Sequence, residues 1–333
     1  MLKINRFFFI SILIGALVLT YCSEVTAQEK HDNRLSPDQY TILKNDPKNI
    51  PSFSFIVTSG AYNINTTGGV ALGGGLGGMF DLSEKVCLSL NGIYQYPWNI
   101  INTDISSLIQ GSSEKRQPWQ EYDIGGTWYP YCSFIKTLEN FKFEVRRKRT
   151  QIYQIPDSVE LKLGIRSGFS EIILPFYCST KFSAFNSFTG YNVSDPVKKK
   201  ILMTGTYATN MDIDMIHVGL SYEIIKDYII KLNDPSDGKT EGTYKTQFYA
   251  DFLFAPIIDY SNIIITKNTY PIISGTYNVN DFSPKSTFGF RLGYSQISYN
   301  DLFKETYEIG YLPGPKGMGL YLLVKGGLCF SFN

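Results

Sequence analysis

Apolar and polar residues alternate along unusually long segments of this chain, and this pattern restricts the fold more than any other feature. The clearest segment is 318–332, where apolar residues occupy almost every second position. A period of two places successive side chains on opposite faces of a β-strand. Some 15 residues exceed the usual strand length of about 5–6 and suffice for the roughly 9–11 that a tilted strand needs to cross a bilayer.

The composition favours strands that face something other than water. Charged residues make up 18% of the chain, below the roughly 25% of typical soluble domains. Aromatic residues lie toward the ends of apolar faces, as in an interfacial girdle: Tyr94, Tyr96, Trp98 and Trp128. No apolar helix is available to cover such a sheet. Closure into a barrel would remove its edges and satisfy its backbone in lipid, so the sequence predicts an all-β, antiparallel transmembrane β-barrel.

The alternation also sets the expected number of strands. It is clear in 70–82, 86–98, 159–166, 216–224, 247–254, 288–294 and 318–332, and weaker in 53–65 and 121–131. These nine segments are an odd number, whereas bacterial single-chain barrels have even numbers of strands. We therefore expect about 10 strands, with the tenth hidden in 171–211 and with 8 or 12 as alternatives. The polar segments 99–118 and 227–243 are expected to be surface loops.

The N-terminus has the features of an export signal. Lys3 and Arg6 precede the apolar run 7–19, and small residues follow at 25–27, which predicts a signal peptide over 1–27. The run is short of the roughly 20 residues of a membrane-spanning helix; a membrane anchor and lipid attachment at Cys22 are the alternatives. Residues 28–50 show little periodicity and are expected to be a flexible N-terminal leader. The barrel domain is expected to cover 51–333.

These features together resemble the small outer-membrane β-barrel proteins of Gram-negative bacteria. The resemblance rests on the signal sequence, the alternating segments, the tight turn at 82–85 and the aromatic final strand that ends at 329–333. Asn333 follows the last Phe, which departs from the strict pattern of the family. The resemblance implies localisation in the outer membrane, contact with outer-membrane lipid and lipopolysaccharide, and insertion by the barrel-assembly machinery. It covers about 51–333 and points to no particular member.

Charge and cysteine content exclude several other functions. Removal of the signal takes away Lys3, Arg6 and Glu24 and leaves equal numbers of basic and acidic residues, so nucleic acid is not an expected partner. No cofactor and no metal site are expected, because the chain has only two histidines and no Cys-x-x-Cys pair. Four cysteines remain after the signal, and the sequence leaves open whether they form disulfides: Cys87, Cys132, Cys178 and Cys329.

The faces opposite the apolar ones predict a polar lumen. The inward set is expected to include Glu160, Lys162, Arg166, His217, Glu223, Asp251, Arg291 and Lys325. Buried ions of both signs are costly unless paired, so we expect them to link the strands and largely occlude the barrel. The predicted function is then a structural, adhesive or binding role through surface loops. A narrow pore for small solutes and a soluble exported β-protein are the alternatives.

Three motifs invite more specific functions. Gly73, Gly75 and Gly78 match a dinucleotide fingerprint, but no helix is expected after them. His217 and Ser221 suggest a lipid hydrolase, yet positions i and i+4 of a strand lie about 13 Å apart. A partner for His217 on a neighbouring strand stays open, as does a lipid-modifying enzyme, although we expect no catalytic residues. The basic run 146–149 could bind lipopolysaccharide phosphates if it lies at the outer rim.

Overall fold

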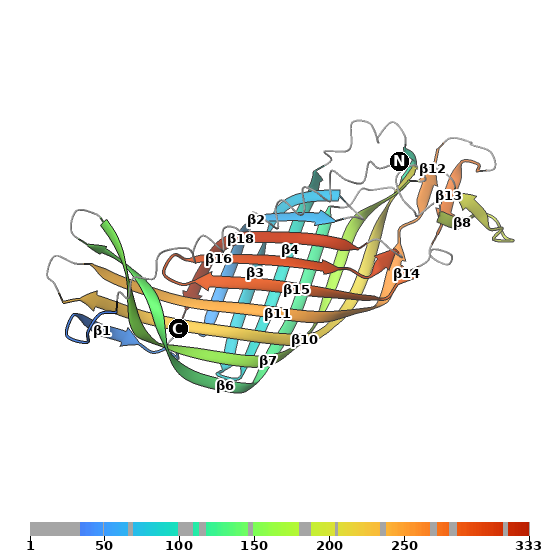
Figure 1. The fold of residues 1–333 in the computed structure, drawn as a ribbon. Coiled ribbons are helices and arrows are strands. Elements are labelled where there is room, and N and C mark those ends of the chain that lie inside the picture. The colour runs from blue at the N-terminus through green and yellow to red at the C-terminus, as the bar shows by residue number, and fades with distance from the viewer. Residues whose placement is uncertain are drawn as a thin grey trace, which may run out of the picture.

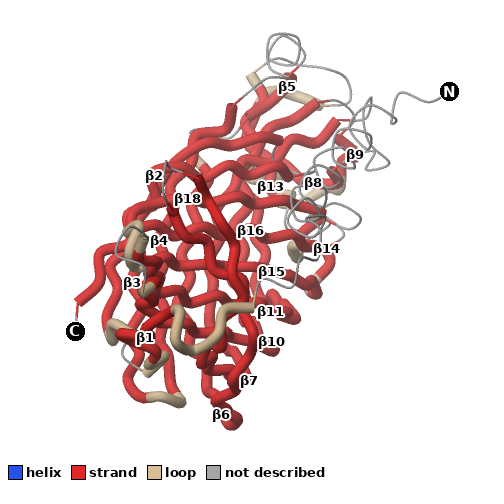
Figure 2. The backbone as a smooth tube through the Cα atoms, turned by 60° about the vertical axis from the view of Figure 1, so that its left-hand side comes forward, coloured by secondary structure: helices blue, strands red, loops and turns tan. Residues whose placement is uncertain are grey.

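A computed structural model of the chain contains β-strands as its regular secondary structure (Figure 2). It describes residues 34–333 except for 49, 66–68, 99–108, 113–117, 146–148, 180–187, 204–205, 234–237, 267–271, 280–284, 316–318 and 333. Within these ranges no helix is long and apolar enough to cross a membrane. The predicted signal peptide, residues 1–27, lies outside the described residues.

Ten strands form a closed antiparallel barrel (Figure 1). They are β2 (Phe53–Asn65), β3 (Gly69–Ser83), β4 (Val86–Trp98), β6 (Trp119–Val145), β7 (Arg149–Ser179), β10 (Thr206–Leu232), β11 (Lys239–Tyr260), β15 (Phe288–Ser298), β16 (Phe303–Tyr311) and β18 (Leu320–Phe332). Each strand pairs with the next, and β18 returns to β2 with Phe332 opposite Phe53. The predicted all-β barrel of ten antiparallel strands is confirmed.

The tenth strand, however, is not where the sequence suggested. Residues 171–179 complete β7 and 206–211 begin β10, so segment 171–211 adds no barrel strand of its own. The additional strand is β16, which has 9 residues. Glu305 interrupts its outward face between Phe303 and Tyr307, while the inward face carries Lys, Thr, Glu and Gly. A short strand with a charge on both faces gives too weak an alternation to stand out.

The loop expected over 227–243 is also corrected by the structure. Residues 227–232 belong to β10 and 239–243 to β11, which leaves 233–238 as the connection. Ile230 and Leu232 are buried in an apolar core, and this packing keeps the polar stretch in strand conformation. In the other expected loop, 99–118, Ile109–Ser112 forms the short strand β5.

The two ends of the barrel differ in their connections. At one end, which we call the short-turn end, the strands are joined by residues 84–85, 146–148, 233–238 and 299–302. β2 begins and β18 ends at this end. At the other, which we call the long-loop end, most connections are longer: 66–68, 99–118, 180–205, 261–287 and 312–319.

Strands β6, β7, β10 and β11 run on beyond the barrel at the short-turn end (Figures 1 and 2). β6 has 27 residues and β7 has 31, whereas β15 has 11. The projecting parts of β6 and β7 pack against β10 through a separate apolar core, formed by Phe141, Phe143, Ile155, Ile230 and Leu232. We call this region, residues 34–48, 134–158 and 225–243, the short-turn extension.

Strand β1 (Tyr40–Asn45) completes the short-turn extension. It pairs antiparallel with β10, from Tyr40 opposite Leu232 to Asn45 opposite Tyr228. Lys44 forms an ion pair of 2.7 Å with the buried carboxylate of Asp227. Because β10 pairs with β11 on its other side here, β1 satisfies an edge that would otherwise be open. The expectation of a flexible leader over 28–50 therefore does not hold for β1.

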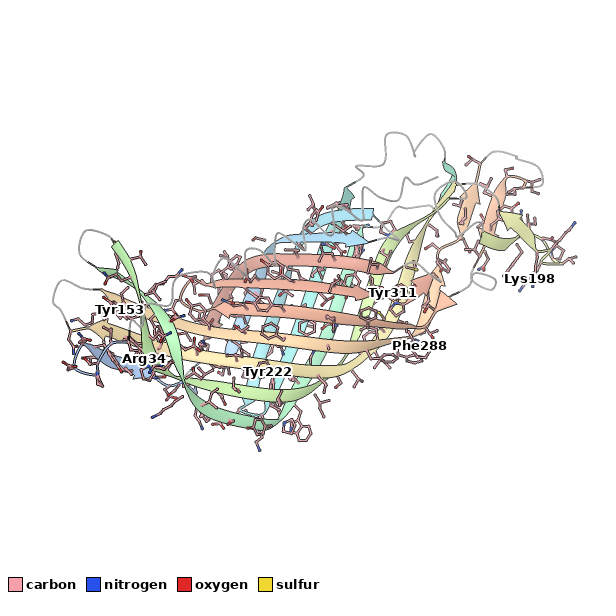
Figure 3. The ribbon with its side chains drawn as sticks, in the orientation of Figure 1. Arg34, Tyr153, Lys198, Tyr222, Phe288 and Tyr311 are labelled. Atoms are coloured by element: carbon pink, nitrogen blue, oxygen red, sulfur yellow. The ribbon has the colours of Figure 1, made fainter. Side chains whose placement is uncertain are left out.

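The long loops fold into a small sheet that continues the barrel wall at the long-loop end. It contains β5, β8 (Phe188–Asn192), β9 (Ile201–Met203), β12 (Ile263–Ile265) and β13 (Gly275–Asn278), in the order β10-β5-β12-β13-β8-β9. We call it the loop sheet. β14 (Lys285–Ser286) and β17 (Gly314–Pro315) form a separate two-stranded pair. The hairpin β8–β9, with Lys198 near its tip, projects from this end (Figure 3).

Candidate functional site

The lumen of the barrel is the most elaborate polar site in the described structure. Alternate residues of each strand point inward, and many of those in the middle of the barrel are charged or hydroxyl-bearing. The structure places all eight predicted lumen residues there, with side chains 0–17% exposed: Glu160, Lys162, Arg166, His217, Glu223, Asp251, Arg291 and Lys325. They divide into three groups according to their partners.

The first group centres on Arg291 of β15. Its Nε donates to Oδ2 of Asp251 on the adjacent β11 at 2.6 Å, and its Nη1 lies 3.4 Å from Oδ2 of Asp123 on β6. Arg166 of β7 reaches the other oxygen of Asp251 at 3.3 Å and stacks on the ring of Tyr249 at 3.9 Å. Two cations and two carboxylates thus bind four strands together in the middle of the lumen.

Lys325 of β18 belongs to a second group, which lines the same cavity as the first. Its ammonium lies 3.3 Å from Oε1 of Glu121. Glu308 of the neighbouring strand β16 accepts hydrogen bonds from the hydroxyls of Tyr249, at 2.7 Å, and Tyr321. Tyr249, which stacks on Arg166, therefore connects this second group with the first.

The third group lies toward the short-turn end. Lys245 is 2.9 Å from Asp81 and 3.4 Å from Glu223. Glu223 also accepts a hydrogen bond of 2.8 Å from the hydroxyl of Tyr129. Lys162 and Glu160 of β7 form a looser pair at 3.7 Å. These contacts join β3, β6, β10 and β11 on the short-turn side of the group around Arg291.

His217 has partners from two neighbouring strands, but their geometry differs from that of a catalytic triad. Its Nδ1 lies 3.5 Å from Oγ of Ser170 and 3.8 Å from Oδ2 of Asp123. Ser170 donates its own proton to Asp123 at 2.5 Å. In a serine triad the base accepts the hydroxyl proton with one ring nitrogen and meets the carboxylate with the other. Here both groups share Nδ1, so the arrangement anchors the imidazole rather than activating Ser170.

Two glycines make room for this imidazole. A Cβ on Gly125 would lie 3.3 Å from Nε2 of His217, and one on Gly168 would lie 2.6 Å from its Cε1. The ring therefore sits against the bare backbone of β6 and β7. Ser221 and Glu223, which share the inward face of β10 with His217, make their hydrogen bonds with Gln247 and Tyr129 instead.

An apolar plug closes the lumen at the long-loop end. Its buried inward residues include Trp119, Leu174, Met215, Leu253 and Leu323 from five different strands. The space where the plug meets the charged groups is only about 10 Å³. A larger cavity of about 90 Å³ lies among the charged side chains, on the short-turn side of the plug. The described lumen is therefore filled by side chains apart from room for a few waters.

The outer face of the barrel carries a band of exposed apolar side chains, which we call the outer belt. On β10 the outward positions of 216–224 are Ile, Val, Leu, Tyr and Ile, bounded by Asp214 and Lys226. Leu220 in the middle is 68% exposed, and Phe288 points away from the wall (Figure 3). Exposed members on other strands include Leu76, Leu90, Ile124, Ile165, Phe252, Phe290, Ile309 and Leu328. Tyr94, Tyr96 and Trp128 are exposed as well.

The glycine motif lacks the structural context of a dinucleotide site, and three cysteines have free thiols. Gly73, Gly75 and Gly78 lie within β3, which leads by a tight turn into β4, so the helix that dinucleotide binding requires does not follow them. A Cβ on Gly73 would meet the carbonyl oxygen of Tyr94 at 2.0 Å, so this glycine allows the backbones of two strands to approach. Three thiols are free, Cys87, Cys132 and Cys329; the Cys178 side chain lies outside the described structure.

The basic run cannot be assigned a contact. Residues 146–148 lie outside the described residues, but the strand ends Val145 and Arg149 that flank them pair at the tip of the short-turn extension. The run is thus connected to the short-turn end, where β18 ends, rather than to the long-loop end.

Several important lumen residues were missed in the sequence. Glu121 and Asp123 lie on the weakly alternating segment 121–131, and Glu308 and Lys304 lie on the overlooked strand β16. Lys245 precedes the predicted strand 247–254 by two residues. Parity could have identified Lys245 as inward, because it shares a face of β11 with the predicted lumen residue Asp251. No predicted lumen residue lies on β6 or β16, so parity had no reference there.

Comparison with known proteins gives no assignment: the chain matches no protein-family model and has no significant match among curated proteins. The features that bear on its function are therefore the lumen, the outer belt and the loop sheet.

Proposed function

We propose that this chain is an integral outer-membrane β-barrel with a closed lumen, and that it acts through its long-loop end. The observation that carries the proposal is the outer belt around a charged interior. A soluble barrel would place its apolar side chains inside and its charges outside. In this barrel an exposed band of Leu, Ile, Val and Phe surrounds buried ion pairs, which is the distribution that a lipid environment stabilises.

The dimensions of the outer belt support the same proposal. Its apolar stretch on β10 covers the nine residues 216–224, which matches the roughly 9–11 residues of a tilted membrane-spanning strand. Beyond it, Lys136, Asn140, Lys142 and Glu144 are exposed on the projecting part of β6, as expected for a region in water. The short-turn extension would therefore lie outside the bilayer.

The connections suggest the orientation. Outer-membrane barrels have short periplasmic turns and longer extracellular loops. The short-turn extension, with β1, and the end of β18 would accordingly face the periplasm, and the loop sheet would face outward. Outer-membrane lipid and lipopolysaccharide would contact the belt. The aromatic final strand, with Phe330 and Phe332 exposed, would be the element that the barrel-assembly machinery recognises.

The closed lumen favours a binding or adhesive role over conduction. Ten strands leave only a slightly larger interior than eight, and here ion pairs and the apolar plug fill it. The loop sheet, by contrast, is an ordered surface. Val193 and Val197 near the tip of its β8–β9 hairpin are 52% and 81% exposed, and Lys198 lies over the ring of Tyr191 at 5.3 Å. Exposed apolar and basic groups on an ordered hairpin suit a macromolecular contact.

Labelling of intact cells tests location and orientation together. The variants Val197→Cys, in the loop sheet, and Asn140→Cys, in the short-turn extension, are compared in a background without the native cysteines. A membrane-impermeant maleimide should label Val197→Cys in intact cells, and Asn140→Cys only after the outer membrane is permeabilised. The protein should stay with the membranes during carbonate washing. Its release into the soluble fraction would overturn the membrane proposal.

Conductance in planar bilayers separates a closed barrel from a narrow pore. The refolded protein should show almost no steady current. Trp119→Ala, which removes the largest side chain of the plug, should increase leakage. Large and steady conductance of the unmodified protein would favour the pore.

A further inference from the structure

One lysine in the lumen differs from all the other charged residues there. Lys304 points inward from β16, and its Nζ lies 3.5 Å from the sulfur of Met79. Among the described residues, no carboxylate oxygen lies within 4.0 Å of it. A thioether is a weak acceptor, so it does not compensate an ammonium group. Placing an unpaired charge in a protein interior is costly, and Lys304 therefore calls for a counter-charge.

The nearby carboxylates already have partners. Glu121 is paired with Lys325, and Glu308 accepts hydrogen bonds from two tyrosines. Asp123 lies within 3.4 Å of Arg291. The lumen thus offers Lys304 no free carboxylate among its described residues.

A second lysine lies close to the first. In the pairing of β16 with β18, Lys304 is opposite Gly327, and Lys325 is opposite Thr306. Lys304 and Lys325 are therefore diagonal neighbours on the same face, a relationship that places Cα atoms about 7–8 Å apart. Like charges at this distance repel each other unless an anion lies between them.

The cavity of about 90 Å³ provides the space for such an anion. Both lysines line it together with Arg166 and Arg291, and they face three carboxylates, those of Glu121, Asp123 and Glu308, so the lining has one more cation than carboxylate. Hydroxyl and amide groups of Thr58, Ser89, Asn91 and Thr306 also line it. These groups donate hydrogen bonds to halides and oxyanions alike. The cavity has room for a small ion and several waters.

We propose that Lys304 and Lys325 form a binding site for a small inorganic anion, a halide or a simple oxyanion, inside the lumen. The anion neutralises the unpaired ammonium of Lys304 and links β16 to β18 and, through the cavity wall, to β2 and β4. This site lies at the seam next to the β18–β2 closure, so its occupancy stabilises the closed barrel.

Thermal unfolding in different salts tests the proposal. The protein is refolded in sodium chloride, sodium phosphate or sodium gluconate at equal ionic strength, so that entry into the lumen does not limit binding. Gluconate is a bulky, weakly coordinating anion and serves as the reference. We expect a saturable rise in Tm in chloride or phosphate, of roughly 5 °C when the anion exceeds its Kd about 100-fold. The anion with the lower half-saturation concentration identifies the preferred class.

Variants assign the effect to the site. Lys304→Met should lose the dependence on chloride and phosphate, whereas Lys136→Met, which removes an exposed lysine of the short-turn extension, should retain it. An equal response in Lys304→Met, or equal Tm values in all three salts for the unmodified protein, would overturn the proposal. If Lys304→Met does not refold, anomalous scattering from crystals grown in bromide decides. A peak between Lys304 and Lys325 supports the site, and an empty cavity refutes it.

Discussion

Arg291 and Asp251 stand directly opposite each other on adjacent strands, with Nε of the arginine 2.6 Å from Oδ2 of the aspartate. The same guanidinium extends to Asp123 on β6, and Arg166 of β7 binds the second oxygen of Asp251. Two neighbouring strands on one side of the barrel are thereby tied to two others through the lumen. These ion pairs occupy the middle of the barrel, and the apolar plug occupies its long-loop end.

Replacement of Arg291 should therefore destabilise the barrel strongly. Arg291→Met leaves Asp123 without its arginine partner and weakens the neutralisation of Asp251, and removal of one member of a buried ion pair costs about 3–5 kcal/mol. The free energy of unfolding is measured by urea titration of protein refolded into vesicles. Lys136→Met, in which the lost charge is exposed, is the control and should change stability by less than about 0.5 kcal/mol. Equal stabilities of the two variants would show that the lumen ion pairs do not hold the strands together.

Two exposed leucines allow a matched test of the membrane boundary. Leu220 is 68% exposed in the outer belt, and Leu138 is 48% exposed in the short-turn extension. In lipid, Leu220→Arg should cost about 2–4 kcal/mol, because arginine near the bilayer midplane is unfavourable. Leu138→Arg should cost less than about 0.5 kcal/mol, because its side chain faces water. Equal effects of the two substitutions in vesicles would contradict the assignment of the belt to lipid.

The sequence predicts the barrel well where a strand has one apolar and one polar face. β18 and β15 were found for this reason, and their parity also places Lys325 and Arg291 in the lumen. β16 escaped detection because Glu305 interrupts its outer face. The continuations of β6, β7 and β10 escaped because one face of each packs into a separate apolar core instead of lining a polar lumen. Parity also says nothing about partners: the contacts of Arg291 with Asp123 depend on how the barrel closes.

Strand β1 gives a prediction about the short-turn extension. Deletion of residues 28–48 should expose the edge of β10 and the apolar core around Ile230. We expect faster hydrogen exchange at residues 228–232, whose backbone groups pair with β1, and unchanged exchange at 216–222 within the barrel. Lys44→Met is a milder variant that removes only the ion pair with Asp227, and its exchange should change less. Unaltered protection of 228–232 in the deletion variant would show that β1 is not needed to hold this edge.

The last prediction concerns pH and a carboxyl group of the short-turn extension, outside the outer belt. Burial raises the pKa of Asp157 to about 6, and nearby Lys226 only partly opposes this effect. In the unfolded chain the carboxyl has its ordinary pKa of about 3.9. Above pH 6 both states are ionised, and the folded state carries the full cost of the buried charge. Between pH 6 and pH 4 the folded protein binds a proton that the unfolded chain does not, so stability should rise as the pH falls.

Asp157→Asn removes this titration while keeping the size of the side chain. The variant should be more stable than the unmodified protein at pH 7, by up to about 3 kcal/mol, and the difference should shrink toward pH 4. Urea unfolding at a series of pH values measures both effects. Glu144→Gln, at an exposed position of the same extension, is the control and should follow the unmodified protein at every pH. A constant difference between Asp157→Asn and the unmodified protein from pH 7 to pH 4 would mean that Asp157 does not titrate in this range.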